Sequence, residues 1–157
     1  MKKLAILATV MCVAFMSQAA SFKWTAGNIY GSDGTTKWAG DVSLYAYAYG
    51  ADAATAVLVD TATPVSGTIA NKAFTWNDAV TDKGYNFYFV IEDGGKAFTS
   101  ATKENMIALE SQTQSIGFGN MQGATQNASN WQTIPEPTSG LLLLLGMAGL
   151  ALKRKRA

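Results

Sequence analysis

Residues 41–49, DVSLYAYAY, alternate strictly between two kinds of side chain. Leu44, Ala46 and Ala48 fall on one side of an extended chain, and large aromatic residues fall on the other, because successive strand residues point to opposite faces. The aromatic residues are Tyr45, Tyr47 and Tyr49. Apolar residues of a helix recur every three or four positions instead. The segment therefore predicts a β-strand, and any fold of this chain must contain a sheet.

Further segments share this β character. Residues 22–30 combine aromatic and β-branched side chains, and residues 64–76 suit one or two strands. Residues 85–91 are apolar on both faces, which predicts a central, fully buried strand. Asp33-Gly34 and Asp93-Gly94-Gly95 are turn signals of the kind that close hairpins. Many short strands between such turns predict a mainly β fold, an antiparallel β-sandwich-like domain.

Other segments are ambiguous between helix and strand. Residues 51–60, ADAATAVLVD, have the alanine content of a helix and a TAVLV core typical of a strand; we expect a short helix with Asp52 near its N-cap. Residues 102–110, TKENMIALE, predict a second short helix capped by Thr102. Residues 111–130 are rich in Gln, Asn, Ser and Gly and poor in core residues. We expect a loop there, with a last strand at SIGF or NWQTI.

The N-terminus has the three parts of a secretory signal peptide. Two lysines precede LAILATVMCVAFM, an apolar run of about 13 residues, and Ser17-Gln18-Ala19 then offers the small residues that a signal peptidase reads. We predict a signal peptide over residues 1–19, cleaved after Ala19, with cleavage after Ala20 as the alternative. The run is shorter than the roughly 20 residues of a membrane-spanning helix. Cys12 lies inside the run, which argues against a lipoprotein signal.

The C-terminus carries a second apolar segment. Pro135-Glu136-Pro137 precedes an uncharged run at residues 138–152, roughly 22 Å long as a helix, and four basic residues follow. Basic side chains extend the reach of a short membrane helix and favour its cytoplasmic side. These residues are Lys153, Arg154, Lys155 and Arg156. We expect a transmembrane helix at 138–152; a simple C-terminal anchor and a buried core helix are the alternatives.

In this order, on a chain with a signal peptide, the tripeptide, the apolar run and the basic cluster resemble the PEP-CTERM sorting domain of Gram-negative bacteria. The resemblance covers residues 135–157. It implies that an exosortase, a membrane cysteine protease-transpeptidase, is a processing partner beside signal peptidase. It also implies transient anchoring in the inner membrane, cleavage near Pro-Glu-Pro, and transfer to the cell surface or release outside the cell.

Between the two signals lie about 115 residues, 20–134, enough for one domain with its own core. They carry six lysines, no arginine and ten acidic residues, which gives a net charge of about −4. Nucleic-acid binding needs a basic footprint. We therefore expect no nucleic-acid partner, and the acidity is more simply explained by the solubility of an exported protein.

The domain lacks the residues of most catalytic centres. The chain has no histidine, and its one cysteine, Cys12, lies in the predicted signal peptide. Ser-His-Asp and Cys-His catalysis and His or thiolate metal sites are therefore excluded, and we expect no enzyme, cofactor or metal centre. A carboxylate pair, as in glycosidases, is the remaining catalytic option. Its candidates, which lack the dense spacing of a calcium loop, are Asp41, Asp52, Asp60, Asp78, Asp82, Glu92 and Asp93.

Aromatic residues carry the one binding hypothesis. Tyr45, Tyr47 and Tyr49 should lie about 7 Å apart along one strand face, where an exposed aromatic strip can stack on sugar rings. The alternative, which we favour, is that this face packs on the core. Our first expectation is a structural or adhesive protein of the cell surface or extracellular matrix. The others are a small carbohydrate-binding module, with an extracellular polysaccharide as partner, and a carboxylate glycosidase.

Overall fold

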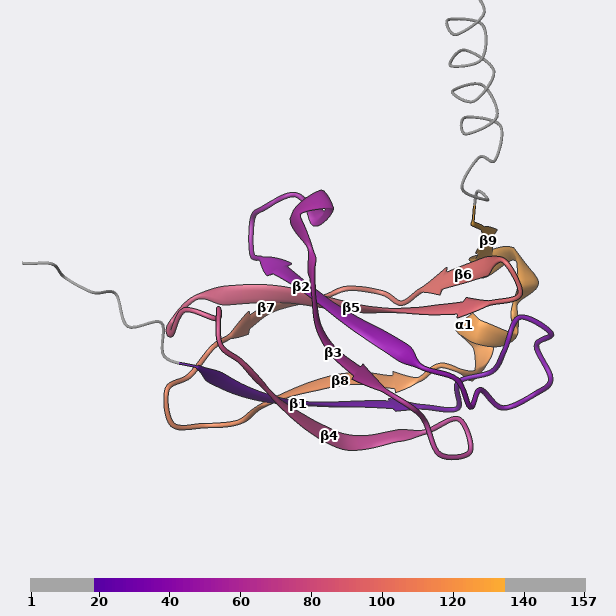
Figure 1. The fold of residues 1–157 in the computed structure, drawn as a ribbon, viewed down its shortest axis with the longest axis horizontal. Helices are drawn as coiled ribbons and strands as arrows, with labels where there is room; N and C mark the ends of the chain where they lie inside the picture. The colour runs from indigo at the N-terminus through magenta and orange to yellow at the C-terminus, as the bar shows by residue number, and fades with distance from the viewer. Residues whose placement is uncertain (1–18, 135–157) are drawn as a thin grey trace, which may run out of the picture.

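The computed structural model describes residues 19–134, which form two β-sheets packed face to face (Figure 1). One sheet has three strands in the order β4-β1-β8. The other has six, in the order β3-β2-β5-β6-β9, with β7 paired to β5. The strands are β1 Ala20–Gly27, β2 Val42–Ala48, β3 Val57–Ala62, β4 Ile69–Trp76, β5 Gly84–Asp93, β6 Lys96–Thr99, β7 Lys103–Ile107, β8 Gln114–Asn120 and β9 Trp131–Thr133. The prediction of a mainly β fold is confirmed.

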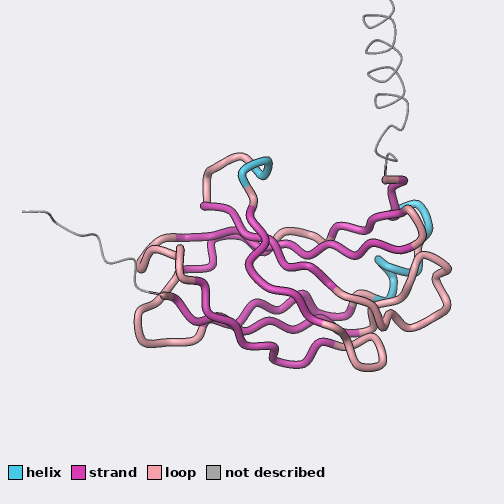
Figure 2. Tube along the Cα trace, viewed as in Figure 1, coloured by secondary structure: helices cyan, strands magenta, loops and turns pink. Residues whose placement is uncertain are grey.

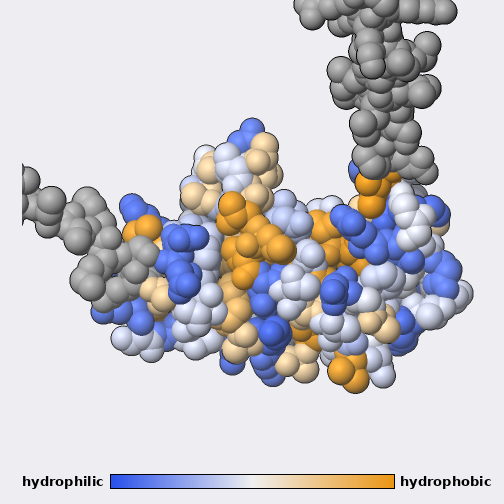
Figure 3. Space-filling view, in the orientation of Figure 1, coloured by the Kyte–Doolittle hydropathy of each residue, from blue (hydrophilic) through white to orange (hydrophobic). Residues whose placement is uncertain are grey.

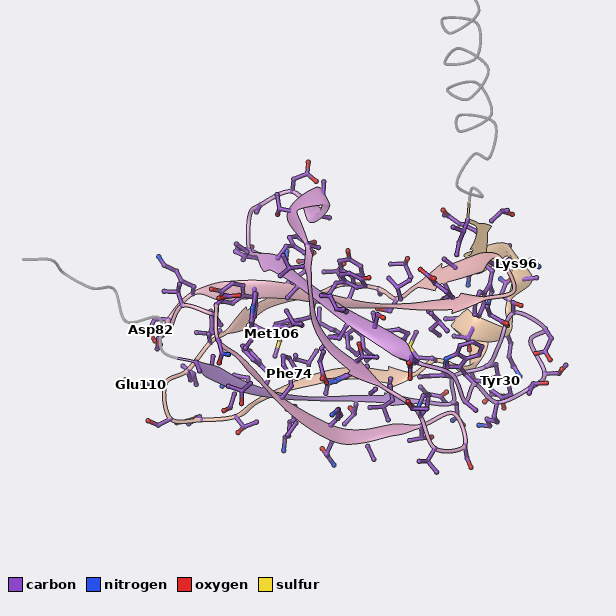
Figure 4. All side chains as sticks on the ribbon, viewed as in Figure 1. Tyr30, Phe74, Asp82, Lys96, Met106 and Glu110 are labelled. Atoms are coloured by element: carbon purple, nitrogen blue, oxygen red, sulfur yellow. The ribbon has the colours of Figure 1, made fainter. Side chains whose placement is uncertain are left out.

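The inner faces of β1 and β2 show why the sheets pack together. Both strands alternate between buried and half-buried residues, and Phe22 and Trp24 of β1 are fully buried. The core is rich in aromatic rings: the centroids of Phe22 and Phe87 are 5.1 Å apart. Figure 4 shows Phe74 and Met106 between the two sheets. Burial of one large apolar side chain stabilises a fold by about 1.5–3 kcal/mol, so this core accounts for the association of the layers.

The three-stranded sheet is not wholly antiparallel. β1 pairs antiparallel with β4 but parallel with β8, where Trp24 lies opposite Ile116. The prediction of an antiparallel sandwich is wrong for this pair. The chain reaches β8 from β7, a strand of the other sheet. A crossing between sheets, unlike a hairpin, allows the strand to return in the parallel direction.

β5 is a central strand, as its sequence predicts. It pairs with β2 along one side and with β6 and β7 along the other. Phe87, Phe89 and Ile91 are buried on its inner face, but Tyr88 and Val90 on the outer face are half-buried. The prediction of a fully buried strand is therefore wrong, because no further layer of the described residues covers the outer face of this sheet.

Residues 102–110 form a strand and not the predicted helix. β7 supplies the first half of β5 with its hydrogen-bonding partner, and Tyr85 lies opposite Met106. The N–H of Asn105 donates to the Oδ1 of the buried Asn86 at 3.0 Å. Pairing with an otherwise unsatisfied strand outweighs a weak helix propensity.

Residues 51–60 also differ from the predicted helix. They contain a single 3₁₀ turn, η1 Ala53–Thr55, and then enter β3. Asp52 caps the turn as predicted, since its Oδ1 accepts a hydrogen bond from the N–H of Ala54 at 2.9 Å. The β-branched valines that follow favour the strand, which pairs with β2 at the edge of the sheet.

Residues 111–130 are richer in structure than predicted. They contain β8, the helix α1 Gln122–Gln126 and the 3₁₀ turn η2 Ala128–Asn130. Ile116, Phe118 and Met121 are buried, so the expectation of few core residues is wrong. Both candidate positions for the last strand, SIGF and NWQTI, contain strands, in β8 and β9.

Buried Thr125 joins three separate segments. Its Oγ1 accepts from the N–H of Tyr30 at 3.1 Å and donates to the carbonyl of Met121 at 2.9 Å. Its own carbonyl accepts from Nε1 of Trp131 at 2.8 Å. The long loop after β1, helix α1 and strand β9 are therefore connected through one fully buried residue.

The two predicted turns have different settings. Asp93-Gly94-Gly95 closes the β5–β6 hairpin, and both glycines have positive φ, +55° and +80°, as a two-residue hairpin turn requires. Asp33-Gly34 instead lies in the long loop between β1 and β2 (Figure 2), and an isolated antiparallel bridge joins Tyr30 to Lys37 within this loop. This loop connects one sheet to the other.

The terminal predictions fall mostly outside the described residues. These are the signal peptide up to residue 18, the Pro135-Glu136-Pro137 motif, the membrane helix at 138–152 and the basic tail. Within residues 19–134, none of the helices has the length and apolar character needed to cross a membrane.

Candidate binding face

The outer face of the six-stranded sheet carries a group of tyrosines. Tyr45 and Tyr47 of β2 project there together with Tyr88 of β5, because the register places Tyr45 directly opposite Tyr88. We call these three residues the tyrosine face. The rings of Tyr45 and Tyr88 are stacked, with centroids 5.5 Å apart and an interplanar angle of 11°. Tyr47 lies 6.3 Å from Tyr88 at an angle of 60°.

The tyrosine face is directed away from the core. Tyr45, Tyr47 and Tyr88 are half-buried, whereas Leu44 and Ala46, which alternate with the tyrosines along β2, are fully buried. The favoured prediction, that the tyrosines pack on the core, is therefore wrong. The small and aliphatic residues of β2 already fill its inner face, so the aromatic side chains take the outer one.

Crowding of the three phenols changes their electrostatics. Partial burial, followed by the nearby Tyr45 and Tyr47, raises the pKa of Tyr88 above its ordinary value of 10.0. The phenol of Tyr88 therefore keeps its proton at neutral pH and can donate or accept a hydrogen bond.

Apolar side chains extend the tyrosine face toward the edge of the sheet. Leu58 of β3 lies opposite Tyr45 and is 55% exposed, and its neighbour Val57 is 49% exposed. Figure 3 shows the resulting hydrophobic patch over the start of β3 and the middle of β2. Tyr49, the third tyrosine of the sequence pattern, follows the end of β2 and is 58% exposed.

A groove of about 350 Å³ opens beside the tyrosine face. It combines two aromatic rings, two carboxylates and small residues, an arrangement typical of small-ligand sites, where apolar walls bind and a few polar groups orient. Its lining residues are Trp38, Gly40, Asp41, Ser43, Tyr45, Val90 and Glu92. The groove thus joins the loop after β1 to the outer face of β2 and β5.

Two glycines determine the position of Trp38. A Cβ atom on Gly40 would lie 2.6 Å from Cζ2 of the indole, and a Cβ on Gly31 would lie 3.6 Å from Cε3. The indole therefore packs directly on the backbone. Its Nε1 donates to the carbonyl oxygen of Asp41 at 3.2 Å. Trp38 is half-buried, and the glycines hold its ring at the groove.

A larger groove, about 650 Å³, lies between the edge strands β3 and β4. Small and polar side chains such as Thr61, Thr68 and Ala70 line it, together with Val65 and Ile69. No aromatic residue or carboxylate is among its lining residues. It therefore lacks the combination of flat apolar and hydrogen-bonding groups found at the smaller groove.

Comparison with protein families identifies the segment into which β9 continues. The PEP-CTERM protein-sorting motif matches residues 133–156. The C-terminal segment is a PEP-CTERM sorting motif. It implies an exported protein that is sorted at the membrane and processed by an exosortase, so this part of the prediction is confirmed. No curated protein and no solved structure matches the chain.

The PEP-CTERM motif begins inside the fold. Its first matched residue, Thr133, is the last residue of β9, and one residue, Ile134, separates this strand from Pro135. The N–H of Ile134 donates to the carbonyl of Gly95 at 2.8 Å, in the β5–β6 hairpin. The sorting motif therefore starts at the sheet that carries the tyrosine face.

The carboxylates proposed as a catalytic pair are mostly dispersed. Asp60 points inward, where its Oδ2 accepts from Nε1 of the buried Trp24 at 2.8 Å. Asp93 accepts from the N–H of Ser32 at 2.7 Å. Asp52 caps η1, and the backbone of Asp82, at φ +63°, bonds to Ala108 at the far end of the domain. Among residues 19–134, no three acidic side chains gather where they could hold a metal ion.

The structure brings Asp41 and Glu92 to the same groove. Both side chains are exposed, and Oδ1 of Asp41 accepts from the hydroxyl of Thr63 at 2.6 Å. Sequence reasoning did not connect these two residues, which are 51 positions apart in the chain. Sequence reasoning also missed Tyr88 as a residue of the outer face, although the alternation of polarity in YNFYFVI indicates it. Asn86 and Tyr88 are more polar than Phe87 and its equivalents, which marks the outward face.

Proposed function

We propose that residues 20–134 form a non-catalytic, adhesive module of the cell surface or extracellular matrix, which binds polysaccharide through the tyrosine face. The observation that carries the proposal is the stacked pair of Tyr45 and Tyr88 on the outer side of the six-stranded sheet. Aromatic rings offer flat apolar surface with a polar hydroxyl at the edge. This matches a sugar ring, whose C–H face is apolar and whose rim carries hydroxyl groups.

The surroundings of the tyrosine face support the same function. Ser43 and Glu92 stand on the same face of β2 and β5 and can bond to sugar hydroxyls. The adjoining groove continues the surface past Trp38. An extended face suits a polymer, which contacts several rings in a row, better than it suits a small isolated ligand.

We propose that the module reaches this location by processing at both ends. Ala20 is the first residue of β1, is 1% exposed and lies opposite Trp76. Cleavage after Ala19, which is exposed, keeps β1 whole, whereas cleavage after Ala20 would remove a buried strand residue. Intact mass of the protein recovered from its own host should therefore correspond to a chain that starts at Ala20 and has lost the basic tail.

A glycosidase is the competing interpretation, because Asp41 and Glu92 share the groove. The general acid of a glycosidase is commonly shielded from water, which keeps its carboxyl group protonated at neutral pH. Both side chains are exposed here. We therefore assign them to binding, and we expect incubation with the bound polysaccharide to release no new reducing ends.

Binding should be tested with residues 20–134 and a set of soluble polysaccharides by affinity electrophoresis and calorimetry. Tyr45→Ala and Tyr88→Ala should each weaken binding by about fivefold, through loss of a contact of about 1 kcal/mol. Tyr45→Phe retains the ring and should keep most of the affinity. Val65→Ala, at a 79% exposed residue in the other groove, is the surface control. Equal affinities for Tyr45→Ala, Tyr88→Ala and the wild type would rule out the tyrosine face.

A further inference from the structure

Resting on the proposed function, we infer that the groove beside Trp38 selects a polysaccharide whose sugars carry protonated amines. Polymers of glucosamine are the ligand class, and polymers of uronic acids are excluded. Two features of the groove support this inference: its aromatic walls and the negative charges of the carboxylates around them.

The groove contains carboxylates and no cation. Asp41 and Glu92 are both lining residues, and none of the lysines of the domain is among them. The hydroxyl of Thr63 donates to Oδ1 of Asp41 at 2.6 Å and so orients that carboxylate on the rim of the groove. A protonated amine entering the groove would meet two opposite charges, and a uronate would meet two like charges.

Two further carboxylates stand behind Trp38. A Cβ on Gly31 would lie 3.0 Å from Oδ2 of Asp93 and 3.7 Å from Oδ1 of Asp33, beside the indole. Asp93 and Asp33 accept backbone hydrogen bonds in this loop, from Ser32 and from Thr35. Carboxylates therefore lie near Trp38 both in the groove and beside Gly31.

The nearest lysine of the loop is directed elsewhere. The ammonium of Lys37 donates to Oδ1 of Asn28 and lies 4.7 Å from the centroid of the Tyr30 ring. Its aliphatic chain passes close to Gly67, where a Cβ would lie 2.9 Å from its Cδ. Lys37 therefore belongs to a different contact and does not neutralise the groove.

Aromatic walls add to the preference for a cation. An ammonium group is attracted to the face of a tryptophan or tyrosine ring, most strongly when water is partly removed. The backbone contacts with Gly31 and Gly40 fix Trp38 before any ligand binds. One ring can therefore stack on a sugar while its neighbours and the carboxylates contact the amine of that sugar.

Calorimetry on residues 20–134 with four hexasaccharides tests this selectivity. The probes are β-1,4-linked glucosamine, N-acetylglucosamine, glucose and galacturonic acid. At low salt we expect the glucosamine hexamer to bind about tenfold more tightly than the glucose hexamer, and the galacturonate hexamer to bind weakest. Near 1 M salt, where the Debye length is about 3 Å, the advantage of glucosamine should vanish while binding of the glucose hexamer persists.

The carboxylates are tested with variants of nearly the same shape. The double variant Asp41→Asn and Glu92→Gln should lose the preference for glucosamine, so that it binds the glucosamine and glucose hexamers with equal affinity. Glu110→Gln, at the opposite end of the domain, is the matched control and should behave as the wild type (Figure 4). If the wild type binds the glucose and glucosamine hexamers equally at low salt, the inference is wrong and the proposed function stands. If it binds none of the four, the proposed function fails as well.

Discussion

The hydrogen bond between Trp24 and Asp60 should be a measurable link between the two sheets. Trp24 belongs to β1 of the smaller sheet and Asp60 to β3 of the larger one, and Nε1 lies 2.8 Å from Oδ2. The indole is fully buried and Asp60 is half-buried. Asp60→Ala would leave the indole N–H without this acceptor in a region from which water is largely absent.

The expected loss follows from this geometry. A buried donor that loses its partner costs about 1–3 kcal/mol, and we take about 2 kcal/mol because one of the two partners is only half-buried. For a domain of about 115 residues, this corresponds to a fall of about 8 °C in Tm. Asp60→Asn, which keeps an oxygen acceptor but loses the charge, should cost about half as much.

Urea unfolding of residues 20–134, followed by tryptophan fluorescence, provides the free energies of unfolding. The control is a double-mutant cycle: in a Trp24→Phe background there is no donor, so Asp60→Ala should cost much less than in the wild type. Equal losses in the two backgrounds would show that Asp60 acts through something other than the indole, and the hydrogen bond would not be the link proposed here.

Three other predictions follow from single positions. Thr125→Val should destabilise the domain by about 1–3 kcal/mol in the same urea assay, because the N–H of Tyr30 loses a buried acceptor. Thr125→Ser, which keeps the hydroxyl group, should retain most of the wild-type stability. Gly67→Ala should destabilise far more than Gly94→Ala by thermal unfolding: both have positive φ, but a Cβ on Gly67 would lie 2.5 Å from the Ile29 carbonyl while Gly94 has open space. Hydrogen bonds from Thr36 and then Thr35 hold the pKa of Asp33 well below its ordinary value of 3.8. Its contribution to stability should therefore be complete above pH 3.8 and decline as the pH falls below it, a dependence that Asp33→Ala should lack in urea titrations at a series of pH values.

Local patterns predicted the strands best where one side of the chain was distinctly apolar. Alternation in residues 41–49 gave β2, and the Asp93-Gly94-Gly95 turn gave the β5–β6 hairpin. The pattern could not say which side of β2 faced the core. That choice depends on whether another layer covers the sheet, which is a property of the whole fold. The tyrosine face was therefore assigned to the wrong side.

Other predictions failed because the structure of a segment depends on a strand that is distant in the sequence. TKENMIALE is a strand because β5 needs a second neighbour after β6 ends, and no local propensity records that need. The parallel pairing of β1 with β8 likewise depends on a crossing between sheets. The groove was out of reach for the same reason. Trp38, Asp41 and Glu92 meet because the loop after β1 folds over the far end of β5.

The placement of β9 directly before the sorting motif limits how the processing enzyme can approach. Ile134 alone separates the strand from Pro135, and two residues span at most about 7 Å. Trp131 is anchored in the core by its bond to Thr125. An exosortase acting near Pro-Glu-Pro would therefore meet the folded wall of the domain. A group attached at such a cut would hold the domain on a short stem, so the position of β9 in the sheet would set the orientation of the tyrosine face.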